Sequence, residues 1–215
     1  MPNVLLSAYS GEGPTDKAFL GILIKRVLDR LLLDSPQMIE VLPPVWYGVA
    51  KGLEIASVAI KANEDGIQLY FPHSDTDGEA FDNAFANRIQ PALDELEGKA
   101  VTRPLIVPVL ISRETEAWML ADIDLLLEEL GGKLDRRDLQ LSSNPESYAN
   151  PKEKLDEVIR LANAGQRRRR GIHKADLYEP LASSISLEQL DGLASFQKFV
   201  AATRRALVAV GYLVD

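Results

Sequence analysis

The strongest constraint on the fold is an alternation of short apolar runs with amphipathic segments over residues 1–130. The runs Val4–Ala8, Ile67–Phe71 and Leu105–Ile111 are almost entirely apolar, as in strands covered on both faces of a parallel sheet. A shorter run, Ile39–Leu42, is also expected to be a strand. Between the runs, apolar residues recur at steps of three and four, the period of an amphipathic helix. The chain is therefore expected to form an α/β fold with a Rossmann-like, mostly parallel four-stranded sheet flanked by helices.

The expected helices cover residues 16–33, 52–62 and 79–96, and a further helix begins at Glu114. Thr15 is the expected N-cap of the first helix. Pro108 lies inside the last apolar run, and because proline cannot donate a ladder hydrogen bond it predicts an edge strand or a bulge. From Pro151 onward the pattern is helical. We therefore expect an α/β core over residues 1–130 and a helical C-terminal region over residues 131–215 that packs on this core.

The composition excludes several classes of protein. The chain has 215 residues and no cysteine, which excludes disulfide scaffolds, thiol catalysis and zinc sites of the cysteine type. Two histidines are too few for a histidine-rich metal site. No apolar run approaches the roughly 20 residues that span a bilayer, and no basic segment precedes an apolar stretch at the N-terminus. The expectation is a cytoplasmic protein without a membrane partner.

Acidic residues follow three of the predicted strands. Glu12 lies between two glycines just before a helix, Asp75 and Asp77 follow the third strand, and Glu114 and Glu116 follow the fourth. Side chains at the carboxyl ends of neighbouring parallel strands point into one crevice. Carboxylates gathered there repel each other unless a cation or shared protons offset their charge. In an extended chain the residues i and i+2 point the same way, so Asp75 and Asp77 are expected to flank one cation together.

Oxygen ligands suit Mg²⁺ or Mn²⁺, so the acidic residues predict a divalent metal site. Each motif also has an ordinary structural explanation. A glutamate in a strand–helix turn is commonly solvated, an Asp-x-Asp-Gly segment is a frequent turn, and acidic residues favour a helix N-terminus. Trp118, which follows Glu116, is expected to pack in the core. Lys17 and Lys51 are candidates to reach the acidic crevice, although sequence alone does not place their side chains.

Basic residues gather in one segment of an otherwise acidic chain. The formal net charge is −8, which argues against a protein that coats nucleic acid over its whole surface. Residues 151–174 nevertheless contain eight Lys or Arg and only three Asp or Glu. Such a segment is expected either to hold a phosphate backbone or to form a solvated turn between helices. The candidate nucleic-acid-binding residues are Lys152, Arg167, Arg168, Arg169, Arg170 and Lys174.

The motifs also resemble those of a known group of proteins. Glu12-Gly13 after the first strand and Asp75-x-Asp77 after a later strand resemble the two motifs of Toprim domains, which occur in topoisomerases, primases and OLD-type nucleases. The segments Glu12–Asp16, Glu116–Asp122 and Pro151–Glu153 are similar to those of a bacterial family with Toprim-like motifs related to the RloB-like proteins. Phe196 and Phe199 match its C-terminal Phe-x-x-Phe.

The resemblance implies a Toprim-like fold in which Glu12 serves acid/base chemistry or metal binding and Asp75 and Asp77 hold Mg²⁺. It makes Glu116 the counterpart of an additional Glu in the OLD-like branch. The chain departs from many Toprim domains at Gly78-Glu79, where apolar and small residues follow the Asp-x-Asp motif. It also lacks the ATPase domain that accompanies OLD-type nucleases, so any such ATPase would be a separate protein.

Three functions fit these observations. The first is a Mg²⁺- or Mn²⁺-dependent phosphoryl-transfer enzyme, a nuclease acting on DNA or RNA, with Glu12, Asp75, Asp77 and Glu116 as its catalytic and metal-binding residues. The second is a non-catalytic Toprim-like binding subunit that works with a separate ATPase in a bacterial defence system. The third is a phosphohydrolase that acts on small molecules. The sequence leaves the substrate and the oligomeric state undetermined.

Overall fold

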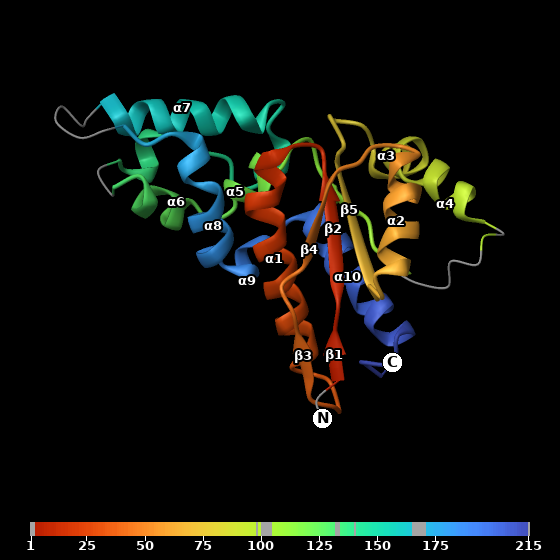
Figure 1. Ribbon diagram of the computed structural model, residues 1–215. Coiled ribbons are helices and arrows are strands. Elements are labelled where there is room, and N and C mark those ends of the chain that lie inside the picture. The colour runs from red at the N-terminus through yellow and green to blue at the C-terminus, as the bar shows by residue number, and fades with distance from the viewer. Residues whose placement is uncertain are drawn as a thin grey trace.

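The computed structural model describes residues 3–97, 99, 105–131, 134–139, 141–164 and 171–214. Among these residues every strand pairing is parallel, and the main sheet has the order β4-β2-β5-β6, with β7 also paired to β5. Helices flank this sheet, so the α/β fold with a mostly parallel sheet is confirmed (Figure 1). The strands are β1 (Asn3–Leu5), β2 (Ser7–Gly11), β3 (Ile39–Val41), β4 (Val45–Val49), β5 (Leu69–Asp75), β6 (Leu105–Ile106) and β7 (Val109–Ile111).

Short interruptions divide what are in effect four parallel strands. β1 pairs with β3 and β2 pairs with β4, so Leu6 interrupts one strand and Pro43-Pro44 interrupts its neighbour. β6 and β7 both pair with β5 and are separated by Val107 and Pro108. Pro108 thus interrupts an outer strand, as predicted. The segment β4, rich in aromatic residues, was not predicted because the two prolines obscure the strand pattern.

Helices cover both faces of the sheet. The alternation along β5 shows the two sides: Leu69 and Phe71 pack in one hydrophobic cluster with α1, whereas Tyr70 packs in another with α2 and α4. In Figure 1, α1 and α2 accordingly lie on opposite sides of the sheet. The helices are α1 (Pro14–Leu32), α2 (Glu54–Glu64), α3 (Phe81–Arg88), α4 (Gln90–Leu96), α5 (Glu116–Met119), α6 (Ile123–Glu129), α7 (Pro151–Ala164), α8 (Tyr178–Ser184), α9 (Leu187–Leu190) and α10 (Ala194–Ala209), with short 3-10 turns at η1 (Arg136–Asp138), η2 (Pro145–Ser147) and η3 (Lys174–Asp176).

Two predicted elements have different bounds in the structure. The helix expected over residues 79–96 is two helices, α3 and α4, which meet at Ile89. Pro91 explains the break, because it has no N–H with which to continue the hydrogen bonds of α3. The strand expected from the apolar run Ile67–Phe71, ending at Asp75, is β5, which begins at Leu69 and ends at Asp75 as predicted. Its polar residues His73 and Ser74 are buried, and they pair in parallel register with β7.

The C-terminal helical region packs on the α/β core. α8 packs on α1, and α10 contacts both α1 and β7. Trp118 is fully buried, as predicted, and packs edge-on against Phe196 of α10. The hydrophobic cluster on this side of the sheet includes both Leu5 of β1 and Leu207 of α10. The division at residue 130 therefore stays a prediction, since one cluster of buried side chains joins the two regions.

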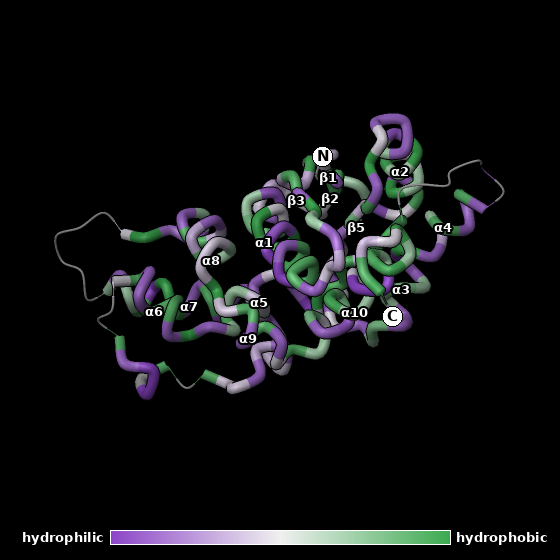
Figure 2. Tube along the Cα trace, turned by 90° about the horizontal axis from the view of Figure 1, so that it is seen from below, coloured by the Kyte–Doolittle hydropathy of each residue, from purple (hydrophilic) through white to green (hydrophobic). Residues whose placement is uncertain are grey.

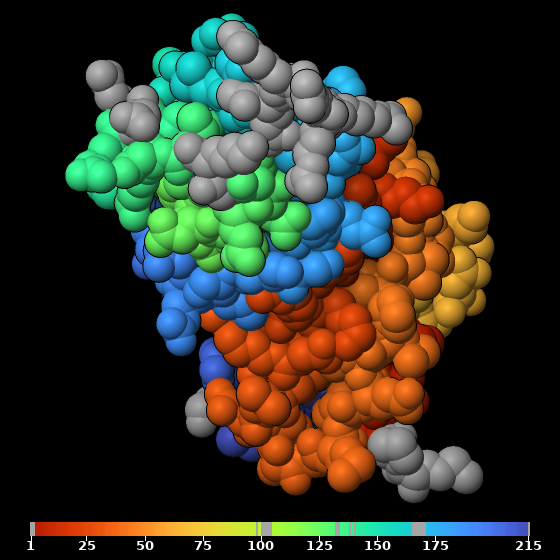
Figure 3. All heavy atoms as spheres, turned by 90° about the vertical axis from the view of Figure 1, so that its left-hand side faces the viewer, coloured from red at the N-terminus to blue at the C-terminus, as the bar shows by residue number. Residues whose placement is uncertain are grey.

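Two further views show how the helices are arranged about the sheet. Figure 2, seen from below, places α6–α9 on one side of α1 and α2–α4 on the far side of the sheet. Figure 3 shows the N-terminal part of the chain, in red to orange, beneath the helical region in green to blue. No helix among the described residues has the length and apolar character needed to cross a membrane.

Candidate functional site

Three neighbouring strands deliver polar side chains to one edge of the sheet. Glu12 follows β2 directly, Asp75 is the last residue of β5, and Lys51 comes two residues after β4. Because β4, β2 and β5 are parallel neighbours, their carboxyl ends meet at the same edge. The predicted convergence of the first two acidic motifs is therefore present in the structure.

The Glu12 carboxylate connects these strand ends. Its Oε1 accepts hydrogen bonds from Ser74 Oγ at 2.5 Å and from the Asp75 main-chain N–H at 3.2 Å. Its Oε2 accepts one from Lys51 Nζ at 2.8 Å. Burial by itself raises the pKa of Glu12, but the hydrogen bonds from Lys51 and Ser74 outweigh it and hold the pKa below its ordinary value. Glu12 is thus an ionised carboxylate at neutral pH.

Asp75 carries a buried carboxylate oxygen without a hydrogen bond. Its Oδ1 has no hydrogen-bond partner among the described atoms, although His73 Nε2 lies 3.4 Å away without hydrogen-bond alignment. Burial raises the pKa of Asp75, the attraction of His73 lowers it, and the nearby charges of Asp16 and Glu12 raise it again, so the net direction is upward. Oδ1 is thus close enough to His73 for an ion pair but accepts no hydrogen bond from the described residues, and a buried acceptor without a hydrogen bond is costly and calls for a functional or ligand-based explanation.

His73 supplies positive charge beneath the site. Its Nδ1 donates to the carbonyl of Val109 at 2.9 Å, and its Nε2 lies 3.4 Å from Asp75 Oδ1 and 3.8 Å from Asp16 Oδ1. Burial lowers the pKa of His73, but Asp75 and Asp16, with the Val109 carbonyl, outweigh it and raise the pKa to about 9. The imidazole is therefore protonated at neutral pH and offsets part of the carboxylate charge.

Asp16 fixes the loop that carries Glu12. Its Oδ2 accepts the main-chain N–H groups of Glu12 at 2.7 Å and of Gly13 at 2.8 Å. The helix α1 begins at Pro14 with Gly13 as the N-cap, so the prediction of Thr15 as the cap was wrong. The side chain of Asp16 satisfies N–H groups at the helix start from within the first turn, which is the usual role of an acidic residue there. Gly11 is packed so closely against this carboxylate that a Cβ would collide with it.

Asp77 lies at the rim of the site and does not project beside Asp75. Asp77 adopts a φ of 50°, so the chain leaves the extended conformation there, and the expectation that both side chains point the same way was wrong. Its side chain is 66% exposed, against 22% for Asp75. Arg88 of α3 connects them: its Nη1 lies 3.0 Å from Asp77 Oδ2 and 3.9 Å from Glu12 Oε1, and it donates to the main-chain carbonyl of Asp75.

Glu116 belongs to a second cluster. It is 6% exposed, accepts a hydrogen bond from Tyr178 Oη at 3.0 Å, and lies 3.7 Å from Lys174 Nζ. Charge and hydrogen bonding from Glu116 add to burial in raising the pKa of Tyr178, whose hydroxyl therefore stays protonated. These partners are held by α8 and η3 rather than by the sheet. The proposed role of Glu116 as a metal ligand stays a prediction.

The other acidic residues after the fourth strand serve local structure. Glu114 Oε2 accepts the main-chain N–H of Lys152 at 3.1 Å, in the first turn of α7. Asp122 caps α6 through the N–H of Leu125 and also accepts the N–H of Ser186. Acidic side chains at helix starts satisfy N–H groups that have no partner within the helix.

The candidate basic residues are only partly described. The run of arginines at 167–170 lies outside the described residues, so its predicted phosphate contacts have no structural account. Lys152 is exposed, and Lys174 Nζ lies 3.1 Å from Asp156 Oδ1 as well as near Glu116. Nucleic-acid binding by Lys152, Lys174 and the arginine run stays a prediction.

The charges at the strand ends are nearly balanced within the protein. Four carboxylates (Glu12, Asp16, Asp75 and Asp77) face three cationic groups (Lys51, His73 and Arg88). Within the described part of the chain, no three Asp, Glu or His side chains are placed together so that they would hold one ion. As described, Lys51 and Arg88 occupy the outer faces of the carboxylates. An added divalent cation would have to replace these contacts.

Sequence reasoning missed three contributors to the site. His73 and Ser74 belong to the strand beyond its apolar run, and two polar residues inside a strand next to Asp75 were an available signal. Arg88 had no such signal, because an arginine at the end of an amphipathic helix is ordinary. Its position results from the packing of α3 beside the end of β5.

Comparison with known proteins adds one finding. Residues 11–203 match the family described as Domain of unknown function (DUF4276), a span that includes Glu12 and every other candidate residue of the site. Comparison with the curated proteins gave no match, and comparison with the solved structures gave none either. The match covers nearly the whole chain, and the protein therefore belongs to the DUF4276 family.

Proposed function

We propose that this protein is a Toprim-like, Mg²⁺- or Mn²⁺-dependent phosphoryl-transfer enzyme that acts as a nuclease on DNA or RNA. One observation carries the proposal: the ionised Glu12 carboxylate contacts the end of β5, where Asp75 Oδ1 is buried without a hydrogen bond. Oxygen donors from two adjacent strand ends suit a hard divalent cation. The order of the motifs, Glu12-Gly13 and then Asp75-x-Asp77, supports a Toprim-like assignment.

The residues fit such an ion, with Glu12 and Asp75 as the groups that would hold it. Asp77 lies on a turn with positive φ, is exposed and contacts Arg88, so it would serve at the outer side of the site. A bound divalent cation supplies charge for a phosphate oxygen and lowers the pKa of an attacking water. Because the pKa of Glu12 lies below its ordinary value, Glu12 suits metal binding better than general-base catalysis.

Two cationic side chains, Lys51 and Arg88, would bind the phosphate directly. Lys51 Nζ lies on the exposed side of Glu12, and the Lys51 side chain is 58% exposed. Arg88 presents a guanidinium between Glu12 and Asp77. Once a cation neutralises the carboxylates, both side chains are positioned to bind phosphate oxygens and orient the scissile group.

The test is a cleavage assay with labelled single-stranded DNA, single-stranded RNA and duplex DNA, in Mn²⁺, in Mg²⁺ and in EDTA. We expect cleavage that requires the metal and is lost in Asp75→Asn, while circular dichroism shows that the variant is folded. Isothermal titration with MnCl₂ should show binding to the wild type and none to Asp75→Asn. Absence of both cleavage and Mn²⁺ binding in the wild type would reject the proposal.

A second candidate is a non-catalytic Toprim-like subunit that binds a separate ATPase. The observation in its favour is that the described carboxylates are already paired with Lys51, His73 and Arg88, so that no three of the side chains able to ligate a metal converge. A stable charge network of this kind would suit a binding module. Copurification with an ATPase, together with no Mn²⁺ binding, would favour this candidate over the enzyme.

A further inference from the structure

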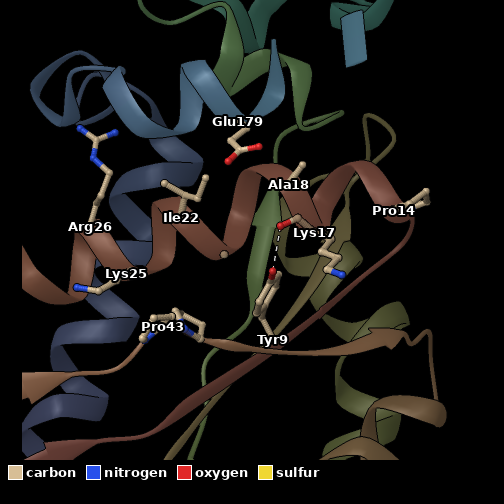
Figure 4. A pocket seen from close by; sticks show the side chains of 11 residues that line it. Tyr9, Pro14, Lys17, Ala18, Ile22, Lys25, Arg26, Pro43 and Glu179 are labelled. Atoms are coloured by element: carbon tan, nitrogen blue, oxygen red, sulfur yellow. Dashed lines mark hydrogen bonds between the residues drawn. The ribbon is translucent and has the colours of Figure 1, made fainter. Parts of the chain in front are cut away.

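A groove runs along the first turns of α1, beside the acidic site. It has a volume of about 490 Å³ and lies between α1 and the Pro43-Pro44 connection that joins β3 to β4 (Figure 4). Tyr9 of β2 lies beneath it, and Glu179 of α8 stands at its rim. A volume of this size is within the usual range of ligand pockets and holds a group of nucleotide size, but it is far too small for a nucleic-acid duplex.

The floor of the groove is apolar and uncharged. Tyr9 is buried, and its hydroxyl donates to the main-chain carbonyl of Lys17 at 2.9 Å. Burial raises the pKa of Tyr9 to about 12, so the ring carries no charge at neutral pH. Gly21 lets the ring approach the helix, since a Cβ at this position would collide with it. Tyr9 is only 4% exposed and supports this floor from beneath, so Ile22 and the two proline rings offer the surface for a flat apolar group such as a base.

The rim of the groove is positively charged in a protein of net charge −8. Lys17, Lys25 and Arg26 line it, against one acidic residue, Glu179. Figure 4 shows the Lys17 amine pointing away from Glu179. Arg26 donates its hydrogen bonds to the main-chain carbonyls of Ala182 and Ile185, which leaves its charge without a carboxylate partner in these contacts. Lys25 pairs with Asp29 at 2.6 Å.

The groove leads to the acidic site. Pro14, at one end, follows Glu12 by two residues, and Tyr9 lies on the same strand as the start of the Glu12 loop. The cations line α1 from Lys17 to Arg26, which at 1.5 Å per residue is roughly 14 Å along the helix. A strand with one phosphate at Glu12 and Asp75 would therefore have its adjoining nucleotides within reach of these side chains.

We infer that this groove binds single-stranded nucleic acid, with its bases over the Ile22 and proline surface and its phosphates on Lys17 and Lys25. The inference rests on the proposed function for the phosphate at the acidic site, and it adds the substrate class and the path of the strand. Single-strand-binding proteins use this combination of a basic groove with apolar or aromatic ring surfaces. Its walls exclude a duplex.

The test measures binding without catalysis. Fluorescence anisotropy in EDTA follows labelled oligothymidylate, the matching RNA and a duplex of the same length, at several salt concentrations. The variant Lys17→Glu/Lys25→Glu should weaken single-strand binding at least about tenfold and reduce the salt slope of log Kd by about 1.4, since each phosphate contact contributes about 0.7. Lys61→Glu on α2, across the sheet, makes the same charge change as either single substitution, Lys17→Glu or Lys25→Glu, so it should stay near the wild type and serves as the control for each of them.

Each outcome decides one claim. Three outcomes would overturn the inference that the groove binds single strands: unchanged binding in the double variant, no single-strand binding by the wild type, or tighter binding of the duplex. The DNA and RNA arms identify which strand it prefers. Metal-dependent cleavage that is insensitive to Lys17→Glu/Lys25→Glu would support the proposed nuclease function and reject the groove as its binding site. Single-strand binding that depends on these lysines, without any cleavage, would support the groove and reject the nuclease function.

Discussion

Replacing Asp75 tests whether its carboxylate stabilises the fold or is kept at a cost in stability. The net upward shift in the pKa of Asp75 means that the folded protein favours its neutral form. At neutral pH the ionised side chain therefore costs stability, mainly because the carboxylate is buried, with the like charges of Asp16 and Glu12 adding to the cost. The neutral amide of Asp75→Asn removes this cost, and it also removes the carboxylate that does most to raise the pKa of His73. We expect the variant to be more stable than the wild type in EDTA at pH 7 by about 1 kcal/mol, at the lower end of the cost of an unpaired buried polar group.

The stability difference between Asp75→Asn and the wild type should depend on pH and on Mn²⁺. A raised folded-state pKa contributes stability that is complete below the unfolded-state value of 3.8 and is lost as the pH rises through the folded-state pKa. The advantage of Asp75→Asn should therefore vanish below about pH 4 and grow as the pH rises. Adding Mn²⁺ at 100 times its Kd should stabilise the wild type by about 2.7 kcal/mol, roughly 5–11 °C in Tm, and leave Asp75→Asn unchanged.

Urea denaturation in EDTA and in Mn²⁺, at pH 4 and pH 7, measures both effects. Asp77→Asn is the control for stability, because the Asp77 side chain is largely exposed and its replacement should change the unfolding free energy by less than about 0.5 kcal/mol. If Asp75→Asn is instead clearly less stable at pH 7 in EDTA, then the carboxylate mainly serves an ion pair with His73. In that case the argument from the unpaired oxygen fails.

Three further predictions concern the same region. Tyr178→Phe should lower the unfolding free energy by about 1–3 kcal/mol in urea denaturation, because it removes the donor to the buried Glu116 carboxylate. The stabilisation by Mn²⁺ should persist, and its loss would place Glu116 in the metal site. The pKa of His73 is raised from 6.5 to about 9, so protonated His73 stabilises the folded protein fully below pH 6.5. This stabilisation is lost toward pH 9, which should lower the free energy of unfolding by an amount on the order of 1–3 kcal/mol. In EDTA, His73→Gln should flatten this decline, and an equal decline in the variant would contradict the assignment. Gly21→Ala should lower the Tm despite the better helix propensity of alanine, because its Cβ meets the Tyr9 ring, and a raised Tm would refute this packing.

The sequence by itself determined the class of fold and the first part of the site. Periodicity identified most strands and helices of residues 1–130, though not β4, since burial on both faces of a parallel sheet requires continuous apolar runs. The position of Glu12 and Asp75 after such runs was sufficient to predict that they meet, because parallel neighbours end at one edge. Pro108 likewise predicted an interrupted outer strand, through its missing N–H.

Only the tertiary structure decided which groups surround these carboxylates. Arg88 reaches the site because α3 packs beside the end of β5, a contact between distant segments that no local pattern encodes. The turn at Asp77 separates it from Asp75, since a single residue with positive φ redirects the chain. Glu116 has the spacing of a site residue, yet α8 and η3 hold it in another cluster. Periodicity reports which residues are buried, whereas the contacts of a charged side chain depend on how whole elements pack.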